Sequence, residues 1–228
     1  MGALMLVTTL LSLGTLSHSV GRPLLRLWGR GMLAILGVRL IVRGREHIRG
    51  RMGRIIPFNH ASTLDIFIVQ ALLPDRGVPV AKREFIRVPI VGWVVYLLDF
   101  ILIDRTNRAR AAASLQRAAS RITREDLSVI IAPEGTRSRT GELGRFKLGP
   151  MHLAVASHAP IVPMVIAGSP QRMPHAPHAA WSATPGPIIV EFLPPIATDD
   201  YTLENLHEHT AALRDRFVAA LARLETEL

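Results

Sequence analysis

The sequence predicts an α/β fold in which a mixed sheet is flanked by helices on both faces. Short apolar runs typical of buried strands alternate with helical patterns from residue 38 onward. Hydrophobic residues make up 49% of the 228 positions and charged residues 20%, which excludes a disordered chain. The first 21 residues carry no charged side chain and are largely apolar, so an N-terminal membrane-associating helical segment is expected before the fold.

No low-complexity linker divides the chain. We therefore expect two parts, namely N-terminal membrane-associating helices at 1–37 and one catalytic domain at 38–228. An apolar helix of about 14 to 18 residues reaches roughly 21 to 27 Å, which is short of the ~30 Å hydrocarbon core. This length favours embedding in one leaflet over crossing the bilayer.

Arg22, Arg26 and Arg30 recur at spacings of four and so form one narrow helical stripe. The opposite arc is apolar: Leu24, Leu25, Trp28, Met32, Ile35 and Leu36. Such a helix can lie in the interface of an anionic membrane; the alternative is a helix packed on the core with a solvated arginine face. The uncharged segment before it favours the membrane. The arginines favour an inner (cytoplasmic) membrane location with the catalytic domain facing the cytoplasm.

The charge distribution argues against a nucleic-acid partner. The net charge is +9, but residues 1–54 hold nine arginines and one acid, whereas the remainder holds 18 Lys and Arg against 17 Asp and Glu. A nucleic-acid domain normally carries its basic charge on the folded body, and this body is nearly neutral. Cysteine is absent, which excludes disulfides, cysteine zinc sites and a cysteine nucleophile.

Strands are assigned to short apolar runs and helices to longer amphipathic or Ala-rich runs. The strands are expected at 38–42, 54–58, 78–81, 100–103, 128–132, 161–166 and 188–192. The helices are expected at 63–73, 89–97, 108–122, 150–157 and 203–228. Of these, 108–122 is Ala-rich and 203–228 is long and amphipathic, and the Pro- and His-rich stretch 169–187 is the one long irregular loop.

A His and an Asp stand where the second strand gives way to a helix, in Asn59-His60-Ala61-Ser62-Thr63-Leu64-Asp65. His60 lies in the turn and Asp65 in the first helical turn, so the carboxylate can reach back to one imidazole nitrogen and leave the other as a base. The spacing from Ser62 to Asp65 also matches a capping box, and both interpretations can hold together.

Three further segments follow strand ends. Residues 132–138, Ala-Pro-Glu-Gly-Thr-Arg-Ser, offer backbone N–H groups, hydroxyls and an arginine that suit a phosphate, although a surface turn with a solvated arginine has the same pattern. Residues 103–105, Ile-Asp-Arg, can equally form a structural Asp–Arg pair. Residues 146–149 and 159–163 are further candidate segments, and each segment is a weak signal when taken singly. The order of all these segments along the chain and their shared position after strands are a stronger signal.

Together these segments resemble the motifs of the glycerolipid (lysophospholipid) acyltransferase family. They read NHASTLD (59–65), DFILIDR (99–105), APEGTRS (132–138), FKLG (146–149) and APIVP (159–163), in the family's order. The resemblance spans roughly residues 36–166. Two positions depart from the family pattern: Asp99 replaces a common glycine and Ala132 the usual phenylalanine, which puts the particular acceptor in doubt.

The resemblance implies that a fatty acyl group passes from acyl-CoA or an acyl-carrier protein to the hydroxyl of lysophosphatidic acid, giving phosphatidic acid at a membrane surface. His60 acts in this scheme as the general base and Asp65 orients its imidazole. Direct transfer fits the residues present, since there is no cysteine and no G-x-S-x-G serine elbow.

The resemblance also implies substrate-binding residues, which are Lys82, Arg105, Glu134, Gly135, Thr136, Arg137 and Lys147. Arg105 and Arg137, with the loop at 134–136, hold the acceptor phosphate. Glu134 helps place the acceptor, either through a hydroxyl or through Arg137. Lys147 or Lys82 faces the thioester oxyanion or a phosphate, and the sequence does not decide between them.

We expect no cofactor and no metal, because neither His175-x-x-His178 nor His207-x-His209 has a convincing third ligand and no P-loop or dinucleotide fingerprint appears. Two alternatives stay open. One is the same chemistry on another lysolipid, namely a lyso-ornithine lipid, lysophosphatidylethanolamine or a glycolipid. The other is a non-catalytic membrane protein that binds anionic lipid through its arginines.

Overall fold

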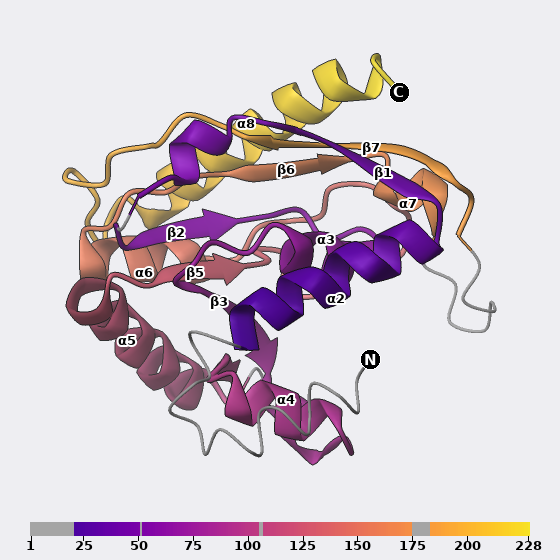
Figure 1. Ribbon diagram of the computed structural model, residues 1–228. Helices are drawn as coiled ribbons and strands as arrows, with labels where there is room; N and C mark the ends of the chain where they lie inside the picture. Colours follow the sequence, from indigo (N-terminus) through magenta and orange to yellow (C-terminus); the bar gives the residue numbers. More distant parts are fainter. Residues whose placement is uncertain (1–20, 51, 105–106, 175–182) are drawn as a thin grey trace.

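The computed structural model describes residues 21–50, 52–104, 107–174 and 183–228 (Figure 1). The strands are β1 (Val38–Arg43), β2 (Arg54–Pro57), β3 (Gly77–Lys82), β4 (Ile101–Ile103), β5 (Ser128–Ile131), β6 (Met164–Ala167) and β7 (Gly186–Phe192). The helices are α2 (Arg22–Ile35), α3 (Leu64–Ala71), α4 (Val91–Leu97), α5 (Arg108–Glu125), α6 (Gly149–Ser157), α7 (Ser169–Arg172) and α8 (Leu206–Glu225). Two short 3₁₀ helices are η2 (Arg45–Ile48) and η3 (Arg83–Arg87).

The strands form two sheets. A parallel four-stranded sheet has the order β2-β5-β3-β4, and a mixed three-stranded sheet has the order β1-β7-β6. In the mixed sheet, β7 is parallel to β1 and antiparallel to β6. Single parallel bridges from Ile55 to Ile161 and from Phe58 to Met164 join the edge of one sheet to the edge of the other. The predicted α/β architecture with mixed strand directions is confirmed.

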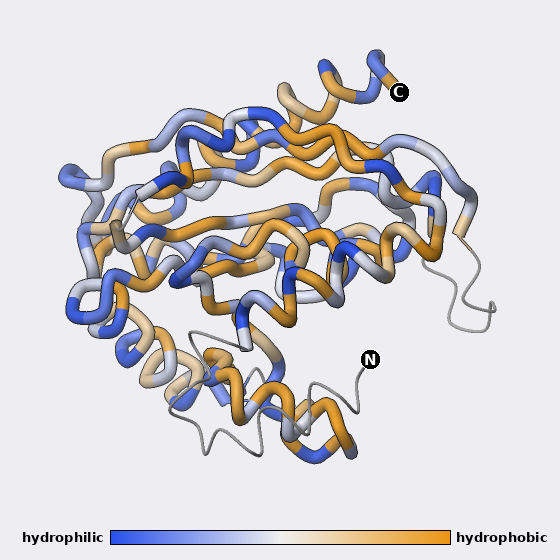
Figure 2. The backbone as a smooth tube through the Cα atoms, viewed as in Figure 1, coloured by the Kyte–Doolittle hydropathy of each residue, from blue (hydrophilic) through white to orange (hydrophobic). Residues whose placement is uncertain are grey.

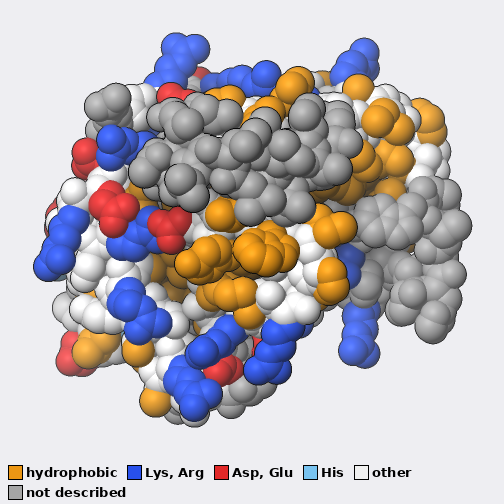
Figure 3. Space-filling model, turned by 60° about the horizontal axis from the view of Figure 1, so that its bottom comes forward, with side chains coloured by type: hydrophobic (Ala, Val, Ile, Leu, Met, Phe, Trp, Pro, Cys, Tyr) orange, Lys and Arg blue, Asp and Glu red, His pale blue; other side chains and the backbone are white. Residues whose placement is uncertain are grey.

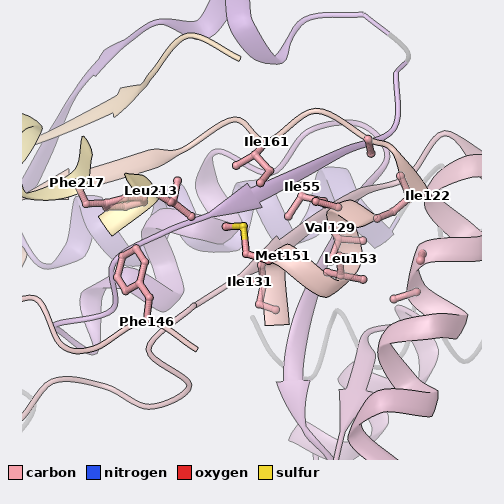
Figure 4. Packing of buried hydrophobic residues seen from close by; sticks show 14 of the residues in the cluster. Ile55, Ile122, Val129, Ile131, Phe146, Met151, Leu153, Ile161, Leu213 and Phe217 are labelled. Carbon is pink, nitrogen blue, oxygen red and sulfur yellow. The ribbon is translucent and has the colours of Figure 1, made fainter. Parts of the chain in front are cut away.

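Helices cover both faces of this layer, as predicted. Neighbouring residues of β2 point to opposite faces, as the two-residue period of a strand requires. Ile55 packs in a core formed with α5, α6 and α8, whereas Ile56 packs in a second core formed with α2 and α3. Figure 4 shows the first core, in which Met151 of α6 lies among Ile55, Ile131 and Ile161. Figure 2 shows the hydrophobic strands between these helix layers.

Helix α2 packs its apolar arc on the body of the protein. Leu25 is 3% exposed, and the ring of Trp28 meets that of Phe67 of α3 edge to face at 5.1 Å between centroids. A Cβ atom at Gly29 would lie 2.6 Å from the backbone of α3, so the two helices approach closely there. Most of the arc therefore packs on the core, as in the alternative, but Ile35 remains 76% exposed and Arg22 of the stripe is only 3% exposed.

The expected N-terminal membrane segment lies largely outside the described residues, because residues 1–20 are not described. Within the part of the chain that is described, no helix is both long enough and apolar enough to cross a membrane.

Several element boundaries differ from the sequence prediction. β6 begins at Met164, because the earlier Ile161 makes only isolated bridges, to Ile55 and to Ile196. α4 begins at Val91, because a γ-turn centred on Ile90 (φ 68°, ψ −53°) precedes it. The stretch expected as one irregular loop contains α7 and the start of β7.

Candidate active site

The candidate catalytic groups gather at the carboxyl edge of the parallel sheet. His60 follows the end of β2 and Glu134 follows the end of the adjacent strand β5. Parallel neighbours end at the same edge, and this is where open α/β sheets normally bind their ligands. The two loops are joined directly, since the Ser138 N–H donates to the His60 carbonyl at 2.8 Å.

The imidazole of His60 is hydrogen-bonded to the carboxylate of Asp65, with 2.9 Å between Nδ1 and Oδ2. The Asp65 side chain is fully buried, whereas that of His60 is 18% exposed. A buried carboxylate that accepts from Nδ1–H fixes the tautomer in which Nε2 carries the lone pair. The structure therefore places the expected pair in the geometry of a base and its orienting group.

The turn before α3 holds Asp65 in this position. Its Oδ2 also accepts from the N–H groups of Ala61 and Ser62 at 2.8 and 2.7 Å. Ser62 Oγ accepts in turn from the Leu64 N–H at 3.1 Å, which satisfies another donor at the helix start. Asp65 thus binds the start of the helix and orients the imidazole at once, as the sequence allowed.

The side chain of Asn59 ties the catalytic turn to the other sheet. Its amide donates to the Ile166 carbonyl and accepts from the Ile166 N–H, both at 2.8 Å, so it pairs with β6 as a strand residue does. Asn59 is 4% exposed. Sequence reasoning gave this residue no role, because its partner is 107 positions away.

Glu134 lies beneath the turn and is 6% exposed. Its Oε1 accepts from the His60 N–H at 2.8 Å and its Oε2 from the Gly144 N–H at 3.0 Å. Burial raises the pKa of the carboxyl, and the two backbone hydrogen bonds oppose that rise. Of the two partners that the resemblance implied for Glu134, a hydroxyl or Arg137, neither is among these hydrogen bonds, which go to backbone N–H groups.

Two cations border the loop that follows β5. The Arg137 guanidinium donates to the Thr63 hydroxyl and is partly exposed. A Cβ atom at Gly135 would lie 2.8 Å from Lys147 Nζ, so the lysine ammonium lies directly over this glycine, whose φ is 74°. Thr136 is exposed beside them. Backbone, hydroxyl and two cations thus meet next to the turn that holds His60.

The other predicted binding residues are less close. Lys82 ends β3 at the same edge of the sheet and is exposed, but no contact brings it to His60. Arg105 lies outside the described residues. Its neighbour Asp104 is buried and pairs with Arg110 of α5 at 3.4 Å. Among the described residues, no cluster of His, Asp and Glu side chains is arranged to hold a metal ion.

Of the two departures from the family pattern, Asp99 lies away from the site. It precedes β4 at the amino edge of the sheet, with a positive φ of 55°, and pairs with Arg121 of α5. Asp99 therefore lies at the edge of the sheet opposite to that of His60 and Glu134. Ala132, by contrast, directly follows β5 and precedes the loop that holds Glu134.

A hollow of about 880 Å³ also lies at the amino edge and so is not the site of His60. Seven arginines line it: Arg22, Arg26, Arg30, Arg45, Arg49, Arg76 and Arg124. The predicted arginine stripe of α2 faces this hollow. Burial, with the nearby charges of Arg121 and Arg76, lowers the pKa of Arg22 to about 10.

A His-Asp pair and a cation-bordered loop thus lie at neighbouring strand ends of an α/β fold. Residues 39–167 match the family described as Acyltransferase, and the chain belongs to this family. The predicted resemblance is therefore confirmed.

The chain is also similar to individual proteins whose enzyme names are known. The chain is 42% identical over 192 residues to "1-acyl-sn-glycerol-3-phosphate acyltransferase" of Limnanthes douglasii, a match that covers 82% of this chain and 65% of that protein. The alpha form of the same enzyme from Mus musculus is 31% identical over 193 residues, covering 85% and 67%. The chain thus spans 65% of the length of the plant relative.

A solved structure shares the fold as well. The crystal structure of the 1-acyl-sn-glycerophosphate (LPA) acyltransferase PlsC from Thermotoga maritima is similar, with a TM-score of 0.73 and 25% sequence identity. The match covers 90% of this chain and 81% of that one.

Proposed function

We propose that the protein transfers a fatty acyl group from acyl-CoA or an acyl-carrier protein to the free hydroxyl of lysophosphatidic acid, giving phosphatidic acid. The observation that carries this proposal is the hydrogen bond of 2.9 Å between His60 Nδ1 and the buried Asp65, at the edge of the sheet where the family motifs meet. The names of the plant, mouse and Thermotoga relatives support the acceptor.

In the proposed reaction, His60 Nε2 accepts the proton of the acceptor hydroxyl as its oxygen attacks the thioester carbonyl. The C–S bond then breaks, and the thiolate takes the proton from the imidazolium as it leaves. Asp65 holds the imidazole and stabilises its positive charge. General-base catalysis of this kind is worth about 10² to 10⁴-fold, and positioning of the two substrates supplies much of the remainder.

The loop after β5 is the proposed site of the acceptor phosphate. Arg137 and Lys147 are the cations there, and the loop backbone at Gly135 can approach a phosphate closely because no Cβ intervenes. Lys82 and Arg105 are proposed to contribute from the neighbouring strand ends. Glu134 is proposed to position the loops by its backbone hydrogen bonds rather than to touch the substrate.

Both substrates carry acyl chains, so the proposed reaction takes place at a membrane surface. We place the protein on the inner (cytoplasmic) membrane, with the segment at 1–20 embedded in one leaflet and the catalytic domain facing the cytoplasm. This orientation follows from the uncharged N-terminal stretch and the arginines after it.

The test is acyl transfer from a labelled long-chain acyl-CoA to lysophosphatidic acid in detergent or liposomes. The wild type is compared with His60→Ala and with His207→Ala, a control that removes an exposed histidine of α8. We expect phosphatidic acid from the wild type and His207→Ala, and at least a hundredfold less from His60→Ala. Equal rates for wild type and His60→Ala would refute the mechanism.

Two other candidates are decided by the same assay. Product formed only with another lysolipid, such as lysophosphatidylethanolamine, would keep the chemistry and change the acceptor; Ala132, beside the acceptor loop, is the departure that favours testing it. No product from folded protein with any lysolipid or with acyl-carrier protein would favour a non-catalytic protein that binds anionic lipid.

A further inference from the structure

Seven large hydrophobic side chains are exposed on η3, on α4 and on the turn between them. They are Phe85, Ile86, Val88, Ile90, Val91, Trp93 and Tyr96, each between 42% and 68% exposed. They make up half of the large hydrophobic side chains exposed by the described residues. Figure 3 shows a face of the molecule on which hydrophobic side chains gather next to several Lys and Arg side chains. We call the seven residues the η3–α4 face; patches of this kind mark interaction sites.

The side chains of the η3–α4 face lie outside the hydrophobic core. α4 buries only Gly92 and Val95. A Cβ atom at Gly92 would lie 2.2 Å from the Ile86 carbonyl oxygen, so η3 and α4 pack backbone against backbone. The apolar side chains that remain point away from this contact and stay exposed among the described residues.

The turn between the two helices exposes the apolar side chain of Ile90. The Val91 N–H donates to the Pro89 carbonyl at 2.7 Å and closes a γ-turn around Ile90, whose φ is 68°. Positive φ is strained for a β-branched residue, and glycine would adopt it at less cost. Ile90 is nevertheless 58% exposed, so it occupies a strained conformation without burying its side chain in this protein.

The border of the η3–α4 face is cationic. Lys82, Arg83 and Arg87 are exposed there, and Glu84 is the one acid on η3. Arg83 and Arg87 also line a hollow of about 370 Å³. An apolar surface that contains Trp and Tyr and has basic side chains beside it is the composition that favours the headgroup region of an anionic bilayer.

The position of the η3–α4 face relates it to the catalytic edge. η3 directly follows β3, whose carboxyl end lies at the same edge as His60 and Glu134. We infer that the η3–α4 face docks on the surface of an anionic lipid bilayer and presents the catalytic edge to that surface. The inference deepens the proposed function and rests on it for the lipid nature of the substrate.

The packing of α2 strengthens this assignment. Its apolar arc lies against α3. Helix α2 exposes only Leu27 and Ile35 among its large hydrophobic side chains, whereas the η3–α4 face exposes seven.

Docking is tested by sedimentation of the full chain with vesicles, without acyl donor or acceptor. The vesicles are phosphatidylcholine alone or phosphatidylcholine with phosphatidylglycerol. We expect Trp93→Ser with Tyr96→Ser to lower the partition coefficient about tenfold or more. Arg83→Gln with Arg87→Gln should weaken binding to the anionic vesicles only. The control is Leu203→Ser with Val218→Ser, which removes exposed hydrophobic side chains elsewhere and should change nothing.

A second measurement distinguishes whether lipid, another part of the chain or a second copy of the chain covers this face. In a chain whose Trp28 and Trp181 are replaced by phenylalanine, Trp93 fluorescence should be quenched by acrylamide in solution and by brominated lipid in vesicles. Protection from acrylamide in a monomer would show that the chain's own residues cover the face, and protection in a dimer would show a second copy. Either result, or unchanged partition of Trp93→Ser with Tyr96→Ser, would overturn the inference. Failure of acyl transfer in detergent would refute the proposed function without affecting these results.

Discussion

Replacing Glu134 tests whether this carboxylate positions the catalytic turn or binds the acceptor. It is 6% exposed and accepts hydrogen bonds from the His60 and Gly144 N–H groups at 2.8 and 3.0 Å. Glu134→Ala leaves both donors without a partner in a buried site, at about 1 to 3 kcal/mol each. We therefore expect the free energy of unfolding to fall by about 2 to 6 kcal/mol.

Glu134→Gln is the more informative change, because the side chain keeps its size. Its one carbonyl oxygen can serve one of the two donors, while its NH₂ group faces the other. Removing a buried charge offsets part of that loss, since burial raises the pKa of this carboxyl. We expect a loss of about 1 to 2 kcal/mol in unfolding free energy. We also expect kcat to fall about tenfold or more, because the backbone of His60 shifts.

The assay combines urea unfolding followed by circular dichroism with kcat and KM measured for lysophosphatidic acid. A positioning role predicts a lower kcat, lower stability and a nearly unchanged KM for the acceptor. If KM for the acceptor rises while kcat and stability stay unchanged, Glu134 binds the substrate and the reasoning from its backbone partners is refuted.

Three further predictions concern the titration of Glu134, the hydrogen bonds of Asn59 and the backbone of Ile90. The pKa of Glu134 is raised in the folded state above the ordinary value of 4.5. Between the unfolded and the folded pKa the folded state binds more protons, so the free energy of unfolding should fall as the pH rises through that range. Glu134→Gln should flatten this slope in unfolding curves measured from pH 4 to 7. Asn59→Ala should lower the unfolding free energy by about 2 to 4 kcal/mol, because both polar groups of Ile166 lose their partner, and a loss below 0.5 kcal/mol would contradict the clamp. Ile90→Gly should raise the melting temperature slightly, through a gain of about 1 kcal/mol from relief of positive φ, whereas destabilisation would argue against the γ-turn.

The sequence predicted best the features that depend on near neighbours. The bond from His60 to Asp65 spans five residues and needs only a turn followed by a helix, so the spacing was sufficient to predict it. The partners of Glu134 were missed, because the His60 N–H lies 74 positions away and meets the carboxylate only after β2 and β5 pair. An amphipathic pattern likewise cannot say whether its apolar side meets lipid or protein, and for α2 it meets α3.

The contact between Asn59 and β6 has a consequence for how much of the chain the reaction requires. The predicted catalytic and binding residues end at Lys147, and a fragment that stops shortly after it would retain all of them. Such a fragment would lack Ile166, and with it both hydrogen bonds that hold the residue before His60. We expect it to be inactive even when it is soluble. The smallest active unit is therefore set by the far strand that supports the histidine, not by the last residue of the catalytic motifs.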